Sequence, residues 1–138
     1  KPNPEKWCLL EVLCHVHDEE IEDFRTRLKF ALEQSIGMPP PIDPVGWVTE
    51  RNYIGQDYSS KLNDFLKERD ASIEWLESLE NPVWENGFVH PKLGLLTADF
   101  YLKNWLAHDY LHFRQITRLK YQYLKEKGGT DIQYAGTW

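Results

Sequence analysis

The chain has 138 residues and a net charge of −6, with 41% hydrophobic and 14% aromatic residues. This size suits one domain, residues 1–138, and the apolar content excludes a disordered chain. The chain has no basic stripe for phosphate contacts, no apolar run of the roughly 18 residues that span a membrane, and no visible signal peptide, so neither nucleic acid nor membrane is an expected partner.

A first long helix is expected over residues 7–34, after a polar lead-in at residues 1–6. The stretch contains neither proline nor glycine, and its apolar residues recur at helical spacing. Gly37 and the prolines at 39–41 follow and end the helix. The first helix is therefore expected to end before Gly37 and not to continue into the next helix.

Residues 42–56 lack a periodic pattern and are expected to form an irregular connection. We expect Trp47 and Tyr53 to anchor it to the rest of the protein. A second helix is expected over residues 57–79, where apolar residues recur at steps of three and four.

Arg69 lies in the apolar stripe of this second helix, four residues from both Phe65 and Ile73. A charge that faces a core needs a partner, because an unpaired buried charge costs several kcal/mol. The position therefore predicts a carboxylate on a neighbouring helix. Glu20 and Asp18 of the first helix are the candidates.

Residues 83–96 are expected to form a second connection, and no strand pattern competes with the helices. A third helix is expected over residues 98–127, with Thr97 as its N-cap and Gly128 after its end. Residues 130–138 are expected to be a loose tail. Long helices without strands predict an all-α bundle.

The two cysteines, Cys8 and Cys14, are six positions apart. On one helix they would lie on different faces, which disfavours a disulfide between them. We expect free thiols, a buried and unreactive Cys14, and a reducing, cytoplasmic location.

His108 and His112 are four residues apart on the third helix, so their side chains point the same way and can share one metal ion. They lie within the apolar face of that helix, where imidazoles need hydrogen bonds or a metal. His15, His17 and His90 are the candidates for a third ligand, and periodicity does not decide between the first two.

The positions of the other histidines and of the glutamates indicate which kinds of metal site are expected. His90 precedes a proline and is expected to shape a turn, while His17 is expected to be exposed. A di-iron bundle would show Glu-x-x-His motifs on paired helices. That pair is absent from the sequence, which argues against a dinuclear centre.

Four segments, in this order and with these gaps, resemble the DinB/YfiT-like superfamily of metal-binding helical bundles. They are a tryptophan-led helix ending in His, Asp and Glu at 7–20, an aromatic-x-x-x-Arg segment at 65–69, a His-Pro-x-x-Gly-x-x-Thr lead-in at 90–97, and an H-x-x-x-H-x-x-Q-I signature within 107–116. Together the segments extend over most of the chain.

The resemblance implies a metal site made of His15, His108 and His112, and so favours His15 over His17. It also implies an up-and-down four-helix bundle. Imidazole ligands suit zinc, nickel, iron or copper, and a divalent ion, zinc or nickel, is the expected one. The family's first helix would lie before Lys1, so we expect it to be missing from this chain. A bundle without that helix would expose an apolar groove, which a partner chain or a homodimer would have to cover.

The resemblance also implies a small-molecule substrate. Some relatives are S-transferases that use a low-molecular-weight thiol such as bacillithiol or mycothiol, and a thiol S-transferase acting on small electrophiles is the first expectation. Arg51 or Arg114 would then hold the carboxylates of the thiol. A metal-dependent hydrolase is the alternative, with Glu19 as its base unless that side chain is solvated. A non-catalytic, stress-related metal-binding bundle is the third.

Overall fold

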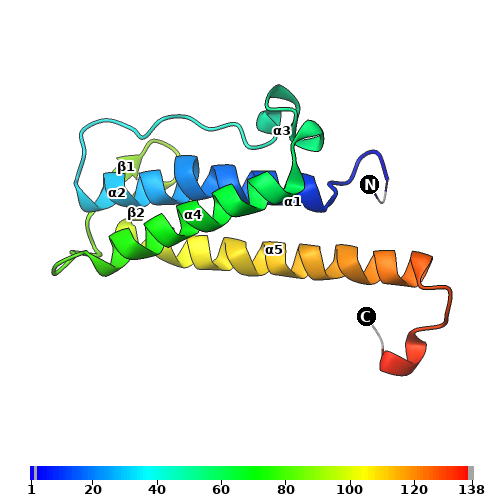
Figure 1. Ribbon diagram of the computed structural model, residues 1–138. Coiled ribbons are helices and arrows are strands. Elements are labelled where there is room, and N and C mark those ends of the chain that lie inside the picture. Colours follow the sequence, from blue (N-terminus) through cyan, green and yellow to red (C-terminus); the bar gives the residue numbers. More distant parts are fainter. Residues whose placement is uncertain (2, 137–138) are drawn as a thin grey trace.

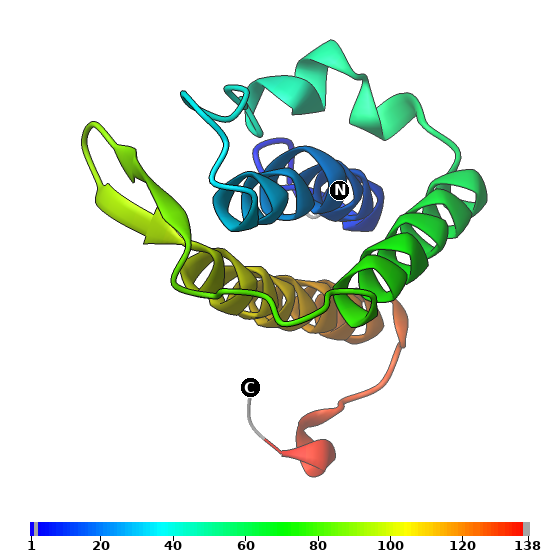
Figure 2. The same ribbon diagram turned by 90° about the vertical axis from the view of Figure 1, so that its left-hand side faces the viewer.

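The computed structural model describes residues 1 and 3–136, and long helices packed side by side dominate it (Figure 1). The helical segments are α1 (Leu9–Glu19), the π-helical η1 (Glu20–Arg25), α2 (Thr26–Leu32), α4 (Tyr58–Glu77) and α5 (Ala98–Lys127). The first three follow one another as a single continuous rod. Seen end-on, this rod lies in the middle, with α4 and α5 on two of its sides (Figure 2). The predicted helical bundle is confirmed.

The long helices begin and end within two residues of the predicted positions. The predicted cap of α5 is confirmed, because Thr97 Oγ1 accepts a hydrogen bond from the Phe100 backbone N–H at 3.1 Å. Asp57 caps α4 in the same way, through the Ser60 N–H at 2.8 Å. In the expected loose tail, Gln133–Ala135 forms a short turn of 3-10 helix, η3, while residues 137–138 lie outside the described part.

The π-helical segment η1 is a feature that apolar periodicity does not reveal. A π turn holds more residues than an α turn and changes which side chains face a neighbour. Here it directs both Glu20 and Phe24 toward α5. Phe24 stacks on Trp105 with ring centroids 6.0 Å apart, and Glu20 Oε2 accepts a hydrogen bond from Trp105 Nε1 at 2.9 Å. The segment therefore sets how α5 lies against the first helix.

The main apolar core lies where α2, the start of α5 and a small β-hairpin meet. The hairpin pairs β1 (Gly87–His90) with β2 (Gly94–Thr97) in antiparallel fashion. Burying these side chains supplies the main stabilisation of the bundle. The buried members are Phe24, Leu28, Ala31, Phe88, Leu96, Ala98, Tyr101 and Trp105.

The hairpin corrects the prediction that residues 83–96 contain no strand. Each strand has only four residues, with Phe88 and Leu96 buried while Val89 and Leu95 are exposed, which is too short a pattern to identify. The turn is set by His90, whose Nδ1 accepts hydrogen bonds from the Lys92 and Leu93 N–H groups at 3.1 and 3.2 Å. The expectation that His90 shapes a turn is confirmed.

The connection over residues 42–56 is more ordered than predicted. It contains α3 (Gly46–Glu50) and a 3-10 turn, η2 (Tyr53–Gly55). Its predicted anchors are confirmed, since Trp47 is 6% exposed and Tyr53 is fully buried. Both pack against Cys14, whose burial raises its pKa to about 11, and both cysteines are free thiols.

Asp18 of α1 fastens this connection to the bundle. Its Oδ2 accepts hydrogen bonds from the Tyr53 hydroxyl at 2.7 Å and from the Arg51 guanidinium at 2.8 Å, while its Oδ1 lies 2.7 Å from His17 Nδ1. Despite the burial of Asp18, the hydrogen bonds from His17, Tyr53 and Arg51 lower its pKa to about 2.

We predict that Asp18→Asn lowers the free energy of unfolding by about 1.5–3 kcal/mol at neutral pH, because hydrogen bonds to a charged group are lost. The folded pKa lies below the unfolded one of about 3.9, so this stabilisation is present above that value and is lost as pH falls from about 4 to about 2. Urea titrations of both proteins at several pH values measure the difference. A difference that stays constant down to about pH 3 would contradict the role given to Asp18.

A cavity of about 330 Å³ lies between α4 and α5, and side chains of α1 line it as well. It is mainly apolar, and His112 is part of its wall. Large apolar side chains also remain exposed on the two helices, namely Leu66 at 49%, Tyr110 at 68% and Phe113 at 61%, and Phe113 lines the cavity. Both helices thus leave apolar surface exposed.

Candidate metal centre

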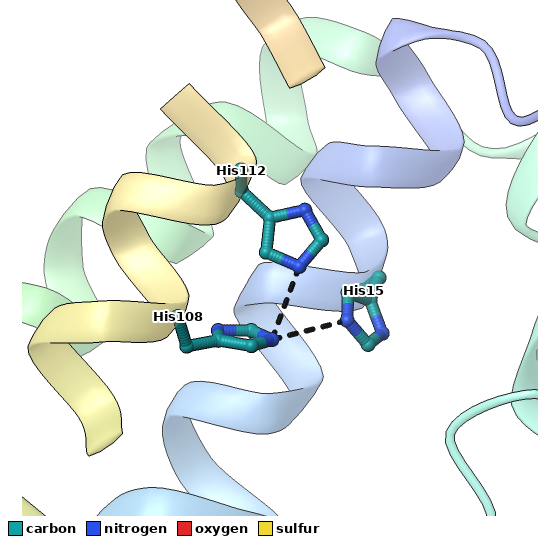
Figure 3. A group of neighbouring side chains, drawn as sticks. All are labelled: His15, His108 and His112. Atoms are coloured by element: carbon teal, nitrogen blue, oxygen red, sulfur yellow. Dashed lines mark hydrogen bonds between the residues drawn. The ribbon is translucent and has the colours of Figure 1, made fainter. Parts of the chain in front are cut away.

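Three histidines from α1 and α5 meet between these two helices (Figure 3). His108 and His112 stand one turn apart on α5, and His15 faces them from α1. His108 Nε2 lies 3.3 Å from His15 Nε2 and 3.0 Å from His112 Nε2. One ring nitrogen from each residue lies within 4.8 Å of the others, so the three could hold one metal ion.

The three imidazoles are held neutral at physiological pH. Burial and, to a smaller extent, the neighbouring imidazoles together lower the pKa of His15 to about 3 and that of His108 to about 4. Burial also lowers the pKa of His112. A neutral imidazole carries a lone pair on one nitrogen, which is the form that binds metals.

Hydrogen bonding alone does not satisfy this cluster. His108 Nε2 faces both other Nε2 atoms, yet a neutral ring can donate one proton at most. The buried Nδ1 of His15 has no hydrogen-bond partner among the described residues. A single cation would accept lone pairs from all three rings, and imidazole nitrogen is a usual ligand for divalent transition metals. The residues therefore fit a metal.

The remaining two histidines lie elsewhere. His90 is in the hairpin, and His17 bonds to Asp18 on the side of α1 that faces the long connection. The expectation that His17 is exposed is wrong, because only 14% of its side chain is accessible. The cause is that residues 42–56 fold back over this side of α1, which the sequence pattern did not predict.

Aromatic rings and one amide surround the cluster. The Trp7 ring centroid lies 4.8 Å from that of His15, and the Phe24 centroid lies 4.9 Å from that of His108. Gln115 Oε1 lies 2.8 Å from His112 Nδ1. Sequence reasoning assigned none of these three residues to the site, although Trp7 and Gln115 belong to the motifs that carry the resemblance.

Glu19 is a buried carboxyl beside the histidines. It is 5% exposed, and its Oε2 lies 4.0 Å from His108 Nε2. The solvated alternative for this residue is therefore wrong. Burial, and then repulsion by Asp23, raise the pKa of Glu19 to about 8. Glu19 and Asp23 can thus share one proton at neutral pH, next to the histidine cluster.

We predict that Glu19→Gln stabilises the metal-free protein at about pH 8.5 and has little effect at about pH 5. The raised pKa means that the folded protein keeps a proton that the unfolded chain releases, so wild-type stability falls as pH rises from about 4.5 to about 8. Glutamine resembles the protonated acid and cannot ionise, so the free energy of unfolding of the variant does not fall in this pH range. Urea unfolding in the presence of a chelator measures the difference, with the exposed Glu74→Gln as control. A difference independent of pH would contradict the raised pKa.

Arg69 links α4 to both helices of the site. Its guanidinium contacts Glu20 Oε2 at 2.8 Å and binds both oxygens of Asp109 at 2.6 and 2.9 Å. The predicted partner Glu20 is confirmed, whereas Asp18 bonds elsewhere. Asp109 directly follows His108, so this ion network fixes the part of α5 that carries the histidines.

The two arginines considered for binding a thiol's carboxylates are not equivalent. Arg51 is already engaged, with Asp18 at 2.8 Å and Glu22 at 2.6 Å, and its guanidinium lies over the Trp47 ring at 4.2 Å. Arg114 is exposed on α5. The structure thus gives Arg51 a structural role and brings neither arginine into the histidine cluster.

Comparison with known proteins shows to which family this chain belongs. In the part of the chain that the structure describes, no helix is long and apolar enough to cross a membrane. A search of curated proteins found no match to this chain. A family model for the DinB superfamily matches residues 1–116, which include every residue of the cluster. The chain therefore belongs to the DinB superfamily.

Proposed function

We propose that His15, His108 and His112 bind one divalent metal ion, zinc or nickel, and that the protein is a metal-dependent thiol S-transferase acting on small electrophiles. The convergence of three neutral imidazoles carries this proposal. Membership of a superfamily of metal-binding bundles supports it. Three protein ligands leave open positions on an ion, as catalytic rather than structural sites do.

The bound ion would lower the pKa of a coordinated thiol, so that the thiol reacts as thiolate at neutral pH. The chain itself contributes neutral ligands and the ring walls of Trp7 and Phe24, which limit water around the cluster. The apolar cavity that reaches His112 has room for a small molecule. These features favour an uncharged, partly apolar electrophile.

A conjugation assay tests the transferase. Tag-free protein loaded with zinc or nickel is mixed with bacillithiol, mycothiol or glutathione and with monochlorobimane. The thiolate displaces chloride from the bimane carbon, and the fluorescent thioether reports the rate. We expect acceleration with at least one thiol and its loss in His108→Ala. Metal binding without acceleration by any thiol would contradict the transferase and leave the hydrolase and the non-catalytic role.

Glu19 supports a second candidate, a metal-dependent hydrolase. Glu19 is buried and its Oε2 lies 4.0 Å from His108 Nε2, so once ionised it is placed to accept a proton from an attacking water. The charge of a bound cation beside it would favour that ionised form. Hydrolysis of p-nitrophenyl acetate by loaded protein tests this function. Glu19→Gln is expected to slow hydrolysis by about 100-fold and to leave thiol conjugation unchanged, because the thiol needs no base once it is ionised. An equal loss of hydrolysis and of thiol conjugation would contradict a role of Glu19 as base in hydrolysis alone.

We also propose that the protein forms a homodimer and works in a reducing, cytoplasmic location. The exposed apolar side chains along α4 and α5 support the first statement, and the two free thiols support the second. Sedimentation velocity of wild type and Phe113→Glu tests the dimer. A wild type that stays monomeric at high concentration would contradict it.

A further inference from the structure

Gln115 forms a hydrogen bond with the outer nitrogen of one candidate ligand. Its Oε1 lies 2.8 Å from His112 Nδ1, one turn along the same face of α5. An amide oxygen accepts hydrogen bonds and cannot donate them. The contact therefore places the ring proton of His112 on Nδ1 and leaves the lone pair on Nε2.

That lone pair points into the cluster. His112 Nε2 lies 3.0 Å from His108 Nε2, and Figure 3 shows the His112 ring directed at the other two. His15 differs, because its buried Nδ1 has no hydrogen-bond partner among the described residues. On that side the Trp7 ring packs against His15, with ring centroids 4.8 Å apart. His112 is thus oriented by a polar contact that His15 lacks.

We propose that Gln115 is a positioning residue, which fixes the Nδ1–H tautomer and the ring orientation of His112 so that Nε2 is ready to bind a cation. The effect on metal affinity rests on the proposed function, whereas the tautomer is a property of the metal-free protein. Residues that hold metal-binding histidines in this way change metal affinity by about 10–100-fold when they are removed. Gln115 is half-buried on α5.

The test uses three variants of the full chain. Gln115→Met keeps the length of the side chain and removes the acceptor, while Gln115→Glu keeps an acceptor. Gln122→Met, two turns further along α5, is the matched control. Long-range ¹H–¹⁵N correlation spectra of metal-free protein at about pH 8, where histidines are neutral, report the tautomer of His112. Zinc competition titrations report the affinity.

We expect the Nδ1–H tautomer in wild type, Gln115→Glu and Gln122→Met. In Gln115→Met we expect a shift toward Nε2–H and an affinity lower by about 10–100-fold. An Nε2–H tautomer in wild type, or a Gln115→Met protein with unchanged tautomer and affinity, would overturn the assignment. A tautomer change in a protein that binds no metal would support the role of Gln115 and contradict the proposed function alone.

Discussion

Replacing Arg69 with alanine is expected to lower the free energy of unfolding by about 3–5 kcal/mol. The change removes the cation that faces Glu20, a side chain that is 1% exposed, and Asp109, which is 14% exposed. Two carboxylates then remain in the bundle without their counter-charge. Because Asp109 follows His108 in the chain, the part of α5 that carries the histidines should loosen as well.

Urea unfolding of metal-free protein measures this effect. Lys103→Ala is the matched control, because its pair with Asp99 lies at the surface, with 74% and 48% of the two side chains exposed. Surface pairs contribute only about 0–1 kcal/mol, so the control should change little. Similar losses in both variants would contradict the central place given to Arg69.

Replacing His15 with alanine is expected to abolish stabilisation by zinc or nickel, whereas His17→Ala should retain it. In wild type, a metal concentration of 100 times Kd should add about 2.7 kcal/mol to the free energy of unfolding. His15 faces His108 at 3.3 Å, while His17 bonds to Asp18 on another side of α1. The two variants remove the same side chain from the same helix and differ in its direction.

Thermal unfolding with and without metal measures this contrast. A metal-dependent rise in Tm that survives in His15→Ala would show that the ion binds elsewhere. A rise that is lost equally in both variants would point to a general effect of changing α1. His90→Ala, in the hairpin, serves as a further control, because that histidine lies outside the cluster.

The helices could be predicted from the sequence because their signals are local. Apolar spacing, the Thr97 cap and the breaks at Gly37 and Gly128 define each helix without reference to its neighbours. The hairpin cannot be predicted in this way, because its strands are short and half exposed. The π turn cannot be predicted either, because apolar periodicity does not distinguish it from an α turn.

The site was predictable only in part, because its third member depends on packing. His15 and His17 lie at opposite edges of one apolar face, and periodicity does not say which edge meets α5, so only the family resemblance favours His15. The ion pair between Arg69 and Asp109 also depends on packing. The two residues are on different helices, so their spacing in the sequence does not predict the contact. Residues on one helix can be placed from periodicity, whereas contacts between helices need the fold.

The metal content of tag-free protein tests the central claim most directly. Wild type and His108→Ala are loaded with zinc or nickel, washed free of loose ions and measured by elemental analysis, with circular dichroism to show that the variant is folded. We predict about one bound ion per chain in wild type and almost none in the variant, because one of three ligands is lost. A wild type that retains no metal, or a folded His108→Ala that retains the same amount, would contradict the three-histidine centre.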